Sequence, residues 1–290
     1  MGENLVTVKI ITDSTSYIPE HIRKELDIRV LSLYVSFPHE SIKETEIRNE
    51  LFYEKMEEKG IPVSSQPSVG ELYEEMKNIV ANGHELLCIF LSSEMSGTYA
   101  SACRVKEKIL EEYEDAKIQI LDSRSNSMQL GFAAIVAARA AKEGKTLDEV
   151  KEIAEKNINR SRFLFIPDNL IYLKKGGRIG GASALIGNVL KIIPILTVQE
   201  GKTTILKTIR TKSKAIKAMI DIMLKDHLDY KIQEIIIHHI NCYEQAKELA
   251  DSLKGVLNKD IDIVDIGPVI GLHVGPGAIG IVYYTEKERT

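Results

Sequence analysis

The stretch ELLCIFLSSEMSGTYASACRVKEKI, residues 85–109, decides the fold class. Its opening segment, Glu85 to Leu91, is largely apolar and has the length of a buried strand. Residues 92–98 are polar, and apolar residues from Tyr99 to Ile109 then recur at helical spacing. A strand, a polar loop and an amphipathic helix thus follow one another, which is the unit from which parallel α/β sheets are built.

The same alternation extends over the first half of the chain. Two expected helices begin with a capping box, Ser68 with Glu71 and Thr146 with Glu149. Because right-handed crossovers bring the loops after parallel strands to one edge of the sheet, a ligand is expected at that edge. Residues 1–160 are therefore predicted to form an N-terminal α/β domain with a parallel sheet. Further strands are expected at residues 6–11, 30–35 and 117–121, and helices at 19–26, 69–80, 128–143 and 146–157.

The second half has a different order of elements. A β-hairpin is expected around Glu200-Gly201, and it is followed by helices and strands that do not alternate strictly. This order predicts a C-terminal α/β domain, residues 161–290, with a mixed sheet. The boundary is placed near Arg160, although no Pro/Gly-rich linker marks it. Strands are expected at 163–166, 192–198, 202–209, 232–239, 261–266 and 279–284, and helices at 168–175, 212–224 and 243–253.

The composition excludes several classes of function. With 38 Lys and Arg against 42 Asp and Glu among 290 residues, the formal net charge is −4, so the chain lacks the basic surface expected of a nucleic-acid-binding protein. The longest apolar runs are about ten residues, half of the roughly 20 that a membrane-spanning helix needs. No charged and apolar leader opens the sequence, so the cytoplasm is the expected compartment.

The possible metal ligands do not form a recognisable set. Cys88, Cys103 and Cys242 are far apart and form no CxxC pair, so neither a zinc site nor a disulfide framework is expected. His238 and His239 are adjacent on an expected strand, where neighbouring side chains point to opposite faces. This pair is therefore interpreted as structural.

Four hydroxyl-rich segments lie just before expected helices: Asp13–Ser16, Ser64–Ser68, Ser92–Thr98 and Asp122–Ser127. Taken singly, each is typical of a helix cap or a turn. Because three of them follow strands that share one sheet edge, they also predict a site lined by hydroxyls and helix N-termini. Such a site suits a singly charged oxyanion.

Two glycine-rich segments in the second half each carry one residue that could bind an anion. Arg178 lies within residues 174–181, and its guanidinium can hold a carboxylate or phosphate through two donors. His273 lies within residues 271–280, where the glycines indicate close backbone approach and hence a buried, oriented ring. The alternatives are a solvated arginine at a helix end and a structural histidine.

Common catalytic and cofactor motifs are absent: the sequence has no GxxxxGK[ST], no GxGxxG after the first strand, no GxSxG and no HExxH. No cofactor is therefore expected. A hydrolase or transferase acting on a small acyl or phosphorylated substrate stays an alternative. Ser96 would then be the nucleophile and His273 the base, with Asp13 or Asp122 orienting the imidazole.

The motifs together resemble the DegV family of bacterial fatty-acid-binding proteins over essentially the whole chain and in the same order. Each motif is short, but six in order are specific. They are Asp13–Ser16, Ser65–Ser68, Ser92-Ser93 with Ser96–Tyr99, Asp122-Ser123, Tyr172–Ile179 and His273–Gly277.

The resemblance implies a two-domain α/β protein that holds one long-chain, palmitate-like fatty acid between its domains and is not itself an enzyme. It implies that the hydroxyls of Ser64 and Ser96 bind the carboxylate, with Ser65, Arg178 and His273 as neighbours. The same loop offers further contacts, namely Ser93, Gly97 and Thr98. Some relatives are the lipid-carrying subunit of a fatty acid kinase, so a separate ATP-binding protein is an implied partner.

A buried acyl chain needs space, and small residues can supply it. Residues 131–138, GFAAIVAA, would form a helix of mostly small side chains. This composition fits a tunnel wall and equally fits a helix packed tightly on a sheet. Both interpretations stay open at the level of sequence.

Overall fold

The computed structural model describes residues 6–185 and 192–289, and its contacts divide the chain into two units. Unit 1 comprises Met1–Leu33 and Ser65–Ile158, and unit 2 comprises Tyr34–Ser64 and Asn159–Thr290. The third and last crossing between the units, from Ile158 to Asn159, lies beside the boundary expected near Arg160. The first two crossings were not anticipated: residues 34–64, which the sequence analysis assigned to the N-terminal domain, belong to unit 2.

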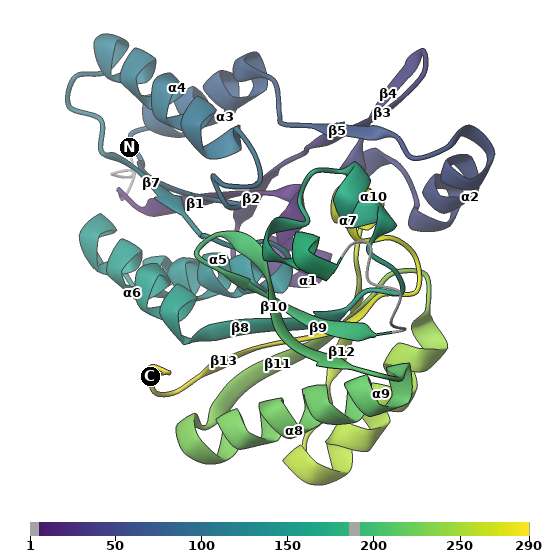
Figure 1. Ribbon diagram of the computed structural model, residues 1–290. Coiled ribbons are helices and arrows are strands. Elements are labelled where there is room, and N and C mark those ends of the chain that lie inside the picture. The colour runs from purple at the N-terminus through teal and green to yellow at the C-terminus, as the bar shows by residue number, and fades with distance from the viewer. Residues whose placement is uncertain (1–5, 186–191, 290) are drawn as a thin grey trace. The chain divides into compact units, whose positions relative to one another are not determined.

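Unit 1 contains a four-stranded parallel sheet with the strand order β2-β1-β6-β7. Helices α3 and α4 cover one face, and α5 and α6 cover the other (Figure 1). Its elements are β1 (Val8–Asp13), η1 (Ser14–Ser16), α1 (Glu20–Glu25), β2 (Ile28–Leu31), α3 (Val69–Ala81), β6 (Glu85–Phe90), α4 (Thr98–Glu112), β7 (Ile118–Asp122), α5 (Ser127–Lys142) and α6 (Leu147–Arg160).

The strand order of unit 1 determines where the loops after β1 and β6 leave the sheet. The chain passes from β1 to β2 on one side and later returns to β6 on the other side of β1. The loops after β1 and β6 therefore leave the sheet at a topological switch point, where open α/β sheets bind ligands. These are the loops beginning at Ser14 and Leu91, and both carry predicted hydroxyl-rich segments.

Helix packing in unit 1 confirms the sequence patterns and resolves one alternative. The capping box of α3 is formed by Ser68 and Glu71 as expected. Most of α5 is buried, and a Cβ placed on Gly131 would lie 2.7 Å from the carbonyl oxygen of Ser16. The small residues of this helix therefore serve close packing on the β1 side of the sheet, because Gly131 leaves no room beside it.

Unit 2 is built on a six-stranded mixed sheet, as predicted, with the order β10-β9-β8-β13-β11-β12. All neighbouring pairs are antiparallel except β11 with β12. Its elements after Asn159 are β8 (Ser161–Ile166), α7 (Ile171–Lys175), η3 (Gly180–Leu185), β9 (Ile193–Gln199), β10 (Lys202–Ile209), α8 (Lys212–Tyr230), β11 (Ile232–His239), α9 (Tyr243–Leu257), β12 (Asp262–Asp265), α10 (Pro268–Val274) and β13 (Ile279–Thr285).

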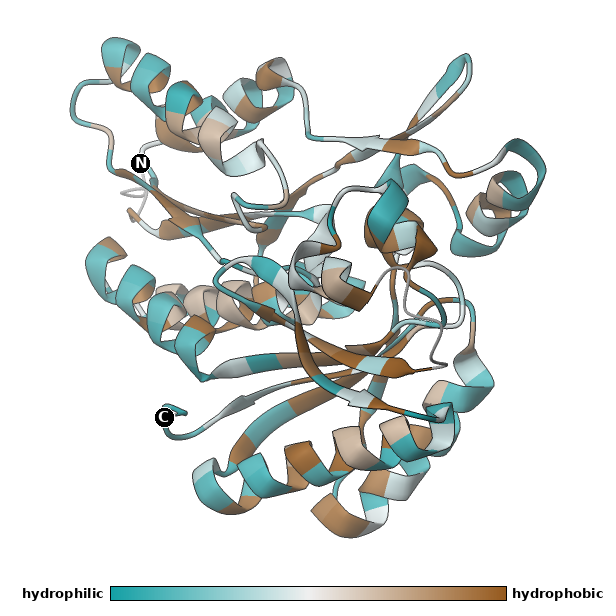
Figure 2. Cartoon of the chain, in the orientation of Figure 1, coloured by the Kyte–Doolittle hydropathy of each residue, from teal (hydrophilic) through white to brown (hydrophobic). Residues whose placement is uncertain are grey.

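The two faces of the unit 2 sheet are covered differently. Helices α8 and α9 bury their apolar sides on one face, with Met219, Met223 and Leu253 fully buried there. Figure 2 shows the mostly hydrophobic strands of this sheet and the alternation of hydrophilic and hydrophobic residues along α8. The other face is left for the short helix α10, which supplies a wall of the cavity described below.

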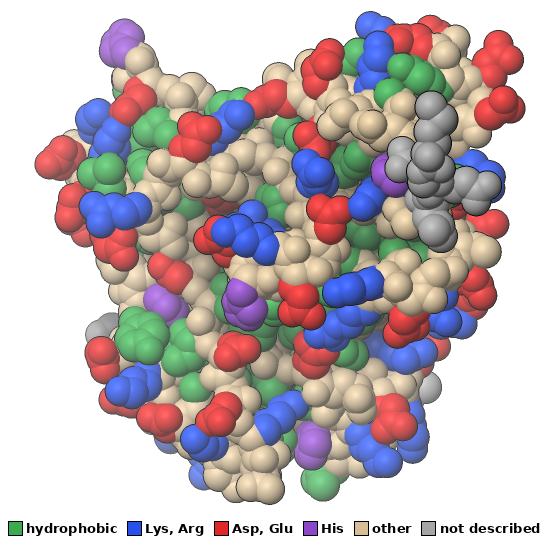
Figure 3. Space-filling view, turned by 180° about the vertical axis from the view of Figure 1, so that it is seen from behind, with side chains coloured by type: hydrophobic (Ala, Val, Ile, Leu, Met, Phe, Trp, Pro, Cys, Tyr) green, Lys and Arg blue, Asp and Glu red, His purple; other side chains and the backbone are tan. Residues whose placement is uncertain are grey.

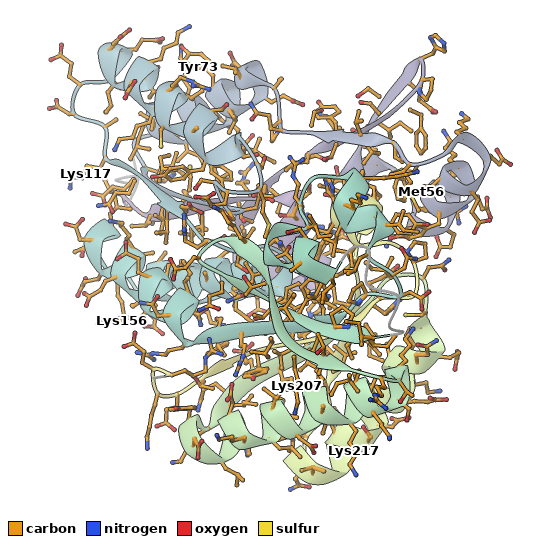
Figure 4. The ribbon with its side chains drawn as sticks, viewed as in Figure 1. Met56, Tyr73, Lys117, Lys156, Lys207 and Lys217 are labelled. Carbon is orange, nitrogen blue, oxygen red and sulfur yellow. The ribbon has the colours of Figure 1, made fainter. Side chains whose placement is uncertain are left out.

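Residues 34–64 form an excursion that packs with unit 2. Its three-stranded sheet has the order β4-β3-β5, and both β3 and α2 contact α10. Met56 lies buried on the side of α2 that faces α10 (Figure 4). The elements of the excursion are β3 (Tyr34–Phe37), β4 (Glu40–Lys43), η2 (Glu44–Glu46), α2 (Asn49–Lys59) and β5 (Val63–Ser65).

Two local expectations were wrong. The strand expected at residues 30–35 is interrupted, because the Leu33 N–H donates to the Ser14 hydroxyl (3.0 Å) instead of continuing a ladder. The glycine-rich residues 271–280 were not expected to be helical, yet α10 ends within them. Glycine weakens helices in isolation, but burial of every residue of α10 overrides that cost here.

The described surface carries both signs of charge. Acidic and basic side chains are interspersed on the face shown in Figure 3, in keeping with the small net charge. Within residues 6–185 and 192–289, no helix combines the length and the apolar character needed to cross a bilayer.

Candidate functional site

Helix α10 carries the polar centre of the candidate site in unit 2. Gly267 is its N-cap residue and Pro268 its first helical residue, a position where the missing N–H of proline costs nothing. His273 lies near the C-terminal end and is only 9% exposed. The sequence therefore turns its glycine-rich segment into a buried helix with one imidazole, which confirms the expected buried ring.

The imidazole of His273 has one bonded nitrogen and one without a partner. Its Nε2 lies 2.9 Å from the Ser64 hydroxyl oxygen, which β5 presents from the end of the excursion. Its Nδ1 is buried and has no hydrogen-bond partner within residues 6–185 and 192–289. The backbone of Gly176 lies so close to Nδ1 that a Cβ at that position would overlap it. The backbone of Gly176 is in the ordinary right-handed region, which any residue can adopt. Glycine is therefore required at position 176 by the close approach of the imidazole and not by backbone conformation.

Burial keeps this imidazole neutral. Desolvation, with a smaller contribution from the positive charge of Arg178, lowers the pKa of His273 to about 4. Arg178 is exposed, and one of its terminal nitrogens donates to the carbonyl oxygen of Gly176 at 2.7 Å. The guanidinium predicted to bind an anion is therefore held beside the imidazole by the same glycine that contacts the ring.

The hydrogen-bond pattern favours one tautomer of His273. A buried N–H without an acceptor is rarer in proteins than an under-satisfied acceptor. Nδ1 has no acceptor beside it among the described residues, so the proton is assigned to Nε2, which then donates to Ser64 Oγ. The Ser64 hydroxyl is left with its own proton to donate, which is what a carboxylate oxygen requires.

An apolar cavity lies on another face of the same helix. Ile270 and Val274, one turn apart on α10, form part of its wall. The cavity has about 240 Å³ of empty space, part of which is open to solvent. Its interior has room for about one water molecule. The rest of the lining comes from β8, β11, β13 and adjacent loops: Phe163, Phe165, His238, Ile240, Ile266, Ala278, Ile279 and Gly280.

In unit 1, the loops at the switch point are joined by a buried carboxylate. Asp13 Oδ1 accepts from the N–H (3.0 Å) and hydroxyl (2.5 Å) of Thr15, and its Oδ2 accepts from the Leu91 N–H at 2.8 Å. Asp13 is fully buried, and desolvation raises its pKa to about 6 against the lowering effect of these hydrogen bonds. Asp13 therefore braces the ends of β1 and β6 against each other.

The serine-rich loop after β6 presents its hydroxyls at the start of α4. Ser96 Oγ lies 2.9 Å from Thr98 Oγ1 and accepts from the Thr98 N–H at 3.3 Å. Gln66 fills the space next to Gly97, where a Cβ would overlap its side-chain oxygen, and its amide nitrogen donates to Ser101 at 2.7 Å. The loop is thus fixed against the segment around Gln66, while Ser96 is only half-buried.

The predicted site residues fall into two groups, one in each unit. Ser64, Arg178 and His273 lie together in unit 2, whereas Ser93, Ser96, Gly97 and Thr98 lie in one loop and helix start of unit 1. Ser93 is exposed, and its N–H donates to Asp122 Oδ1 at 3.2 Å. Ser65 is exposed at the last position of β5.

The arrangement gives no support to a Ser-His-Asp mechanism. Both oxygens of Asp13 are engaged by Thr15 and Leu91, and Asp122 Oδ1 accepts from the N–H groups of Ser93 and Arg124. Within the described ranges, no carboxylate bonds His273 Nδ1, so the imidazole lacks the group that would orient a general base.

His238 and His239 have separate structural partners, as predicted. His238 Nδ1 donates to the Val264 carbonyl oxygen at 2.9 Å, and burial lowers its pKa to about 4. His239 lies 3.3 Å from Asp265. No cluster of three or more possible metal ligands occurs within residues 6–185 and 192–289.

Sequence reasoning missed the apolar cavity and the excursion beside α10. The nearest signal was the pair of apolar residues Ile270 and Val274 around His273, whose helical spacing was hidden by the glycines. Gln66 was noted only as part of a motif, although its side chain holds the Ser96 loop. Long-range contacts such as these leave no periodic pattern.

Comparison with known proteins places this geometry in a family. The chain matches the sequence model described as "Uncharacterised protein, DegV family" over residues 7–286. It is 61% identical over 282 residues to a DegV domain-containing protein of Clostridium acetobutylicum, covering 97% of this chain and 99% of that protein.

Solved structures of the same family have a similar fold. DegV of Bacillus subtilis, a fatty acid binding protein, superposes with a TM-score of 0.88 at 29% identity and covers 97% of this chain and 99% of that one. A DegV family protein of Thermus thermophilus, described for its fatty acid binding, has a TM-score of 0.87 at 25% identity, covering 97% and 100%. The resemblance stated from the motifs is thereby confirmed.

Proposed function

This chain belongs to the DegV family, and on that premise we propose that it is a non-catalytic carrier of one long-chain fatty acid. The carboxylate is bound by the hydroxyl of Ser64, which His273 orients and near which Arg178 supplies positive charge. The acyl tail lies in the apolar region behind α10, where the cavity has to widen to receive it. Ser65 and Ser96, with Ser93, Gly97 and Thr98, are proposed as further head-group contacts on the strength of the family resemblance.

One observation carries the proposal: a single turn of α10 presents a polar side chain and an apolar cavity wall. His273 bonds Ser64, while Ile270 and Val274 line the cavity. A ligand that uses both faces has one oxyanion and one long apolar part. A fatty acid is the simplest molecule of this kind.

The energetics assign different roles to the two ends of the ligand. A sixteen-carbon acid has about 14 CH₂ groups, and burial of each contributes about 0.8 kcal/mol, roughly 11 kcal/mol in all. Association and ordering costs of similar size oppose this gain. The tail therefore supplies most of the affinity, and the hydroxyl donors fix the position of the carboxylate, which must be hydrogen-bonded if it is to stay charged.

The lipid itself provides the direct test. Purified protein is extracted with organic solvent and the extract analysed by mass spectrometry, and the delipidated protein is titrated with palmitate. We expect one fatty acid per chain in both measurements. Protein that neither yields nor takes up a fatty acid would overturn the proposal.

Substitution of the hydroxyls tests the head-group assignment. Ser64→Ala and Ser96→Ala should each weaken palmitate binding by about 1.5–3 kcal/mol, because each removes a donor to a buried charge. Ser252→Ala is the matched control, since the Ser252 hydroxyl donates only within its own helix, to the Leu249 carbonyl oxygen at 2.7 Å. Unchanged binding in the Ser64→Ala/Ser96→Ala double variant would show that both positions are wrong.

We further propose that the carrier presents the carboxylate to an ATP-binding kinase subunit, as the family resemblance implies. The loaded protein, mixed with such a subunit and ATP, should form an acyl phosphate that hydroxylamine traps. Formation of the acyl phosphate by the carrier alone would instead favour an enzyme.

A further inference from the structure

Strand β7 is an edge of the parallel sheet in unit 1. It pairs with β6, and no strand within residues 6–185 and 192–289 pairs with its other side. Helix α4 lies on one face of the sheet beside it and α6 on the other (Figure 1). The backbone groups on the outer side of β7 therefore have no strand to bond.

The hydrogen bonds to β6 show which residues of β7 face outward. The Leu86 N–H of β6 donates to the Lys117 carbonyl oxygen at 2.9 Å. Alternate residues of a strand direct their backbone groups to the same neighbour, so the odd-numbered residues from 117 to 123 turn to β6. Ile118 and Ile120 consequently direct their N–H and C=O groups away from the sheet.

The opposite edge of this sheet, β2, is protected in a way that β7 is not. Arg29 lies within β2, is half exposed and approaches Asp27 and Glu75, each at 3.6 Å. A charged side chain on an edge strand discourages pairing with another chain. Residues 118–121 of β7 contain no charged residue and no proline, so this edge lacks both of these protections.

An open groove lies along the β7 edge, and its two walls carry opposite charge. Lys106 of α4 belongs to one wall, where it is half-buried and has no ion-pair partner among the described residues. The α6 wall carries three acidic residues, Asp148, Glu152 and Glu155, against one lysine, Lys151. A strand in this groove would therefore meet positive charge on one side and mainly negative charge on the other.

The acidic residues of α6 remain able to bind a further cation. Glu152 and Glu155 form ion pairs along their own helix, with Lys156 at 2.5 Å and with Lys151 at 3.3 Å. All four side chains are exposed, and exposed ion pairs of this kind contribute little free energy. A lysine of another chain can therefore compete for these carboxylates.

We propose that the edge of β7 binds an extended segment of a partner protein, which adds a strand to the sheet and carries basic side chains toward α6 and apolar or acidic side chains toward α4. Successive side chains of a strand point to opposite faces, so such a segment alternates between the two kinds. Backbone hydrogen bonds to Ile118 and Ile120 supply affinity, and the alternation supplies specificity. This surface goes beyond the proposed function and does not depend on it.

A second copy of this chain is a poorer occupant of the groove. Antiparallel pairing of two β7 strands about a twofold axis would place the α6 wall of one copy beside the α6 wall of the other. The acidic residues of the two walls would then face each other, and like charges brought together across an interface disfavour association.

Amide hydrogen exchange followed by NMR tests the added strand. The probe is the end-capped peptide Lys-Val-Lys-Glu-Lys-Val-Lys, added to the full-length protein, with a scrambled peptide of the same composition as the control. The amides of Ile118 and Ile120 should gain at least about tenfold protection with the probe. Those of Gln119 and Leu121 already bond β6 and should change little, whereas a peptide held only by its charge would protect none of the four.

Two substitutions test the backbone and the charge separately. Ile120→Pro removes an N–H that points away from β6, so the ladder is kept and the added strand is blocked; peptide affinity should fall at least about tenfold. Lys106→Glu should weaken the probe about threefold, and a peptide with lysine in place of its glutamate should recover that loss. Palmitate affinity should be unchanged in both variants, which shows that they fold.

The outcomes are distinct. The proposal is overturned if the probe gives Ile118 and Ile120 no protection, or no more than the scrambled peptide gives. It is also overturned if their protection rises with protein concentration in the absence of peptide, because the occupant is then a second copy. Should Ile120→Pro fail to fold, the protection pattern and the Lys106→Glu exchange decide. None of these results alters the proposed binding of a fatty acid.

Discussion

Asp13 in unit 1 and His273 in unit 2 are both buried ionisable residues singled out from the sequence, but their surroundings differ. Asp13 accepts hydrogen bonds at both carboxylate oxygens, two from Thr15 and one from the Leu91 N–H. His273 has one nitrogen bonded to Ser64 and the other without a partner among residues 6–185 and 192–289. A buried group that is bonded at each of its polar atoms holds a fold together, whereas a buried group with an unbonded polar atom calls for a further explanation, such as a ligand.

The pKa shifts of the two groups follow from the same desolvation and have opposite consequences. Burial raises the pKa of Asp13 to about 6 and lowers that of His273 to about 4, so both are pushed toward their neutral forms. A bound carboxylate would oppose this effect only at His273. The structural role of Asp13 and the binding role of His273 can therefore be tested separately.

The largest effect is expected where the backbone touches the His273 ring. Gly176→Ala should displace the imidazole from Ser64, because the new Cβ overlaps Nδ1, and palmitate affinity should fall by about 3 kcal/mol, more than about hundredfold. Calorimetric titration measures it. Gly255→Ala, which has open space around its Cβ on α9, should bind normally. Equal affinity in the two variants would contradict the assigned role of His273.

A smaller effect, on stability, is expected at Asp13. Its folded pKa of about 6 exceeds the unfolded value near 3.8, so its contribution is fully present below pH 3.8 and is lost as the pH rises through 6. The free energy of unfolding of wild type, relative to Asp13→Asn, should therefore decrease by roughly 2 kcal/mol between pH 4.5 and pH 7. Denaturant unfolding at both pH values measures it. If the difference in free energy of unfolding between wild type and Asp13→Asn is the same at both pH values, Asp13 does not titrate in this range.

The smallest effect is a titration shift. Palmitate should raise the pKa of His273 from about 4 by about one unit, or 1.4 kcal/mol, because a nearby negative charge favours the imidazolium. NMR of the imidazole measures it, with hexadecanol as the uncharged control. If acid and alcohol shift the pKa equally, the carboxylate is bound elsewhere.

Local sequence patterns predicted most of unit 1. The strand at Glu85, the capping boxes at Ser68 and Thr146 and the hydroxyl-rich loops after β1 and β6 are local features that periodicity and helix capping reveal. The motifs also led to Ser64 and His273, and the structure bonds these two residues to each other. The motifs could not show that Asp13 has a structural role and His273 a binding role, because this difference depends on the hydrogen-bond partners of each side chain in the folded chain.

The excursion and α10 could not be predicted for a physical reason. Their contacts join residues more than 200 positions apart, such as Glu44 with Val269, and contacts at that separation leave no local pattern. The glycines around His273 further disfavour a helix on propensity alone. Only the packed structure shows that a Cβ at Gly271 would overlap the Tyr53 hydroxyl.

The excursion also affects how the protein is made. Ribosomes release residues 34–64 roughly 200 residues before α10, so Tyr53 has no Gly271 to pack against until that helix has been made. The excursion therefore cannot complete its packing until α10 has been made, and a nascent chain stalled after residue 160 would expose apolar side chains of residues 34–64 to chaperones.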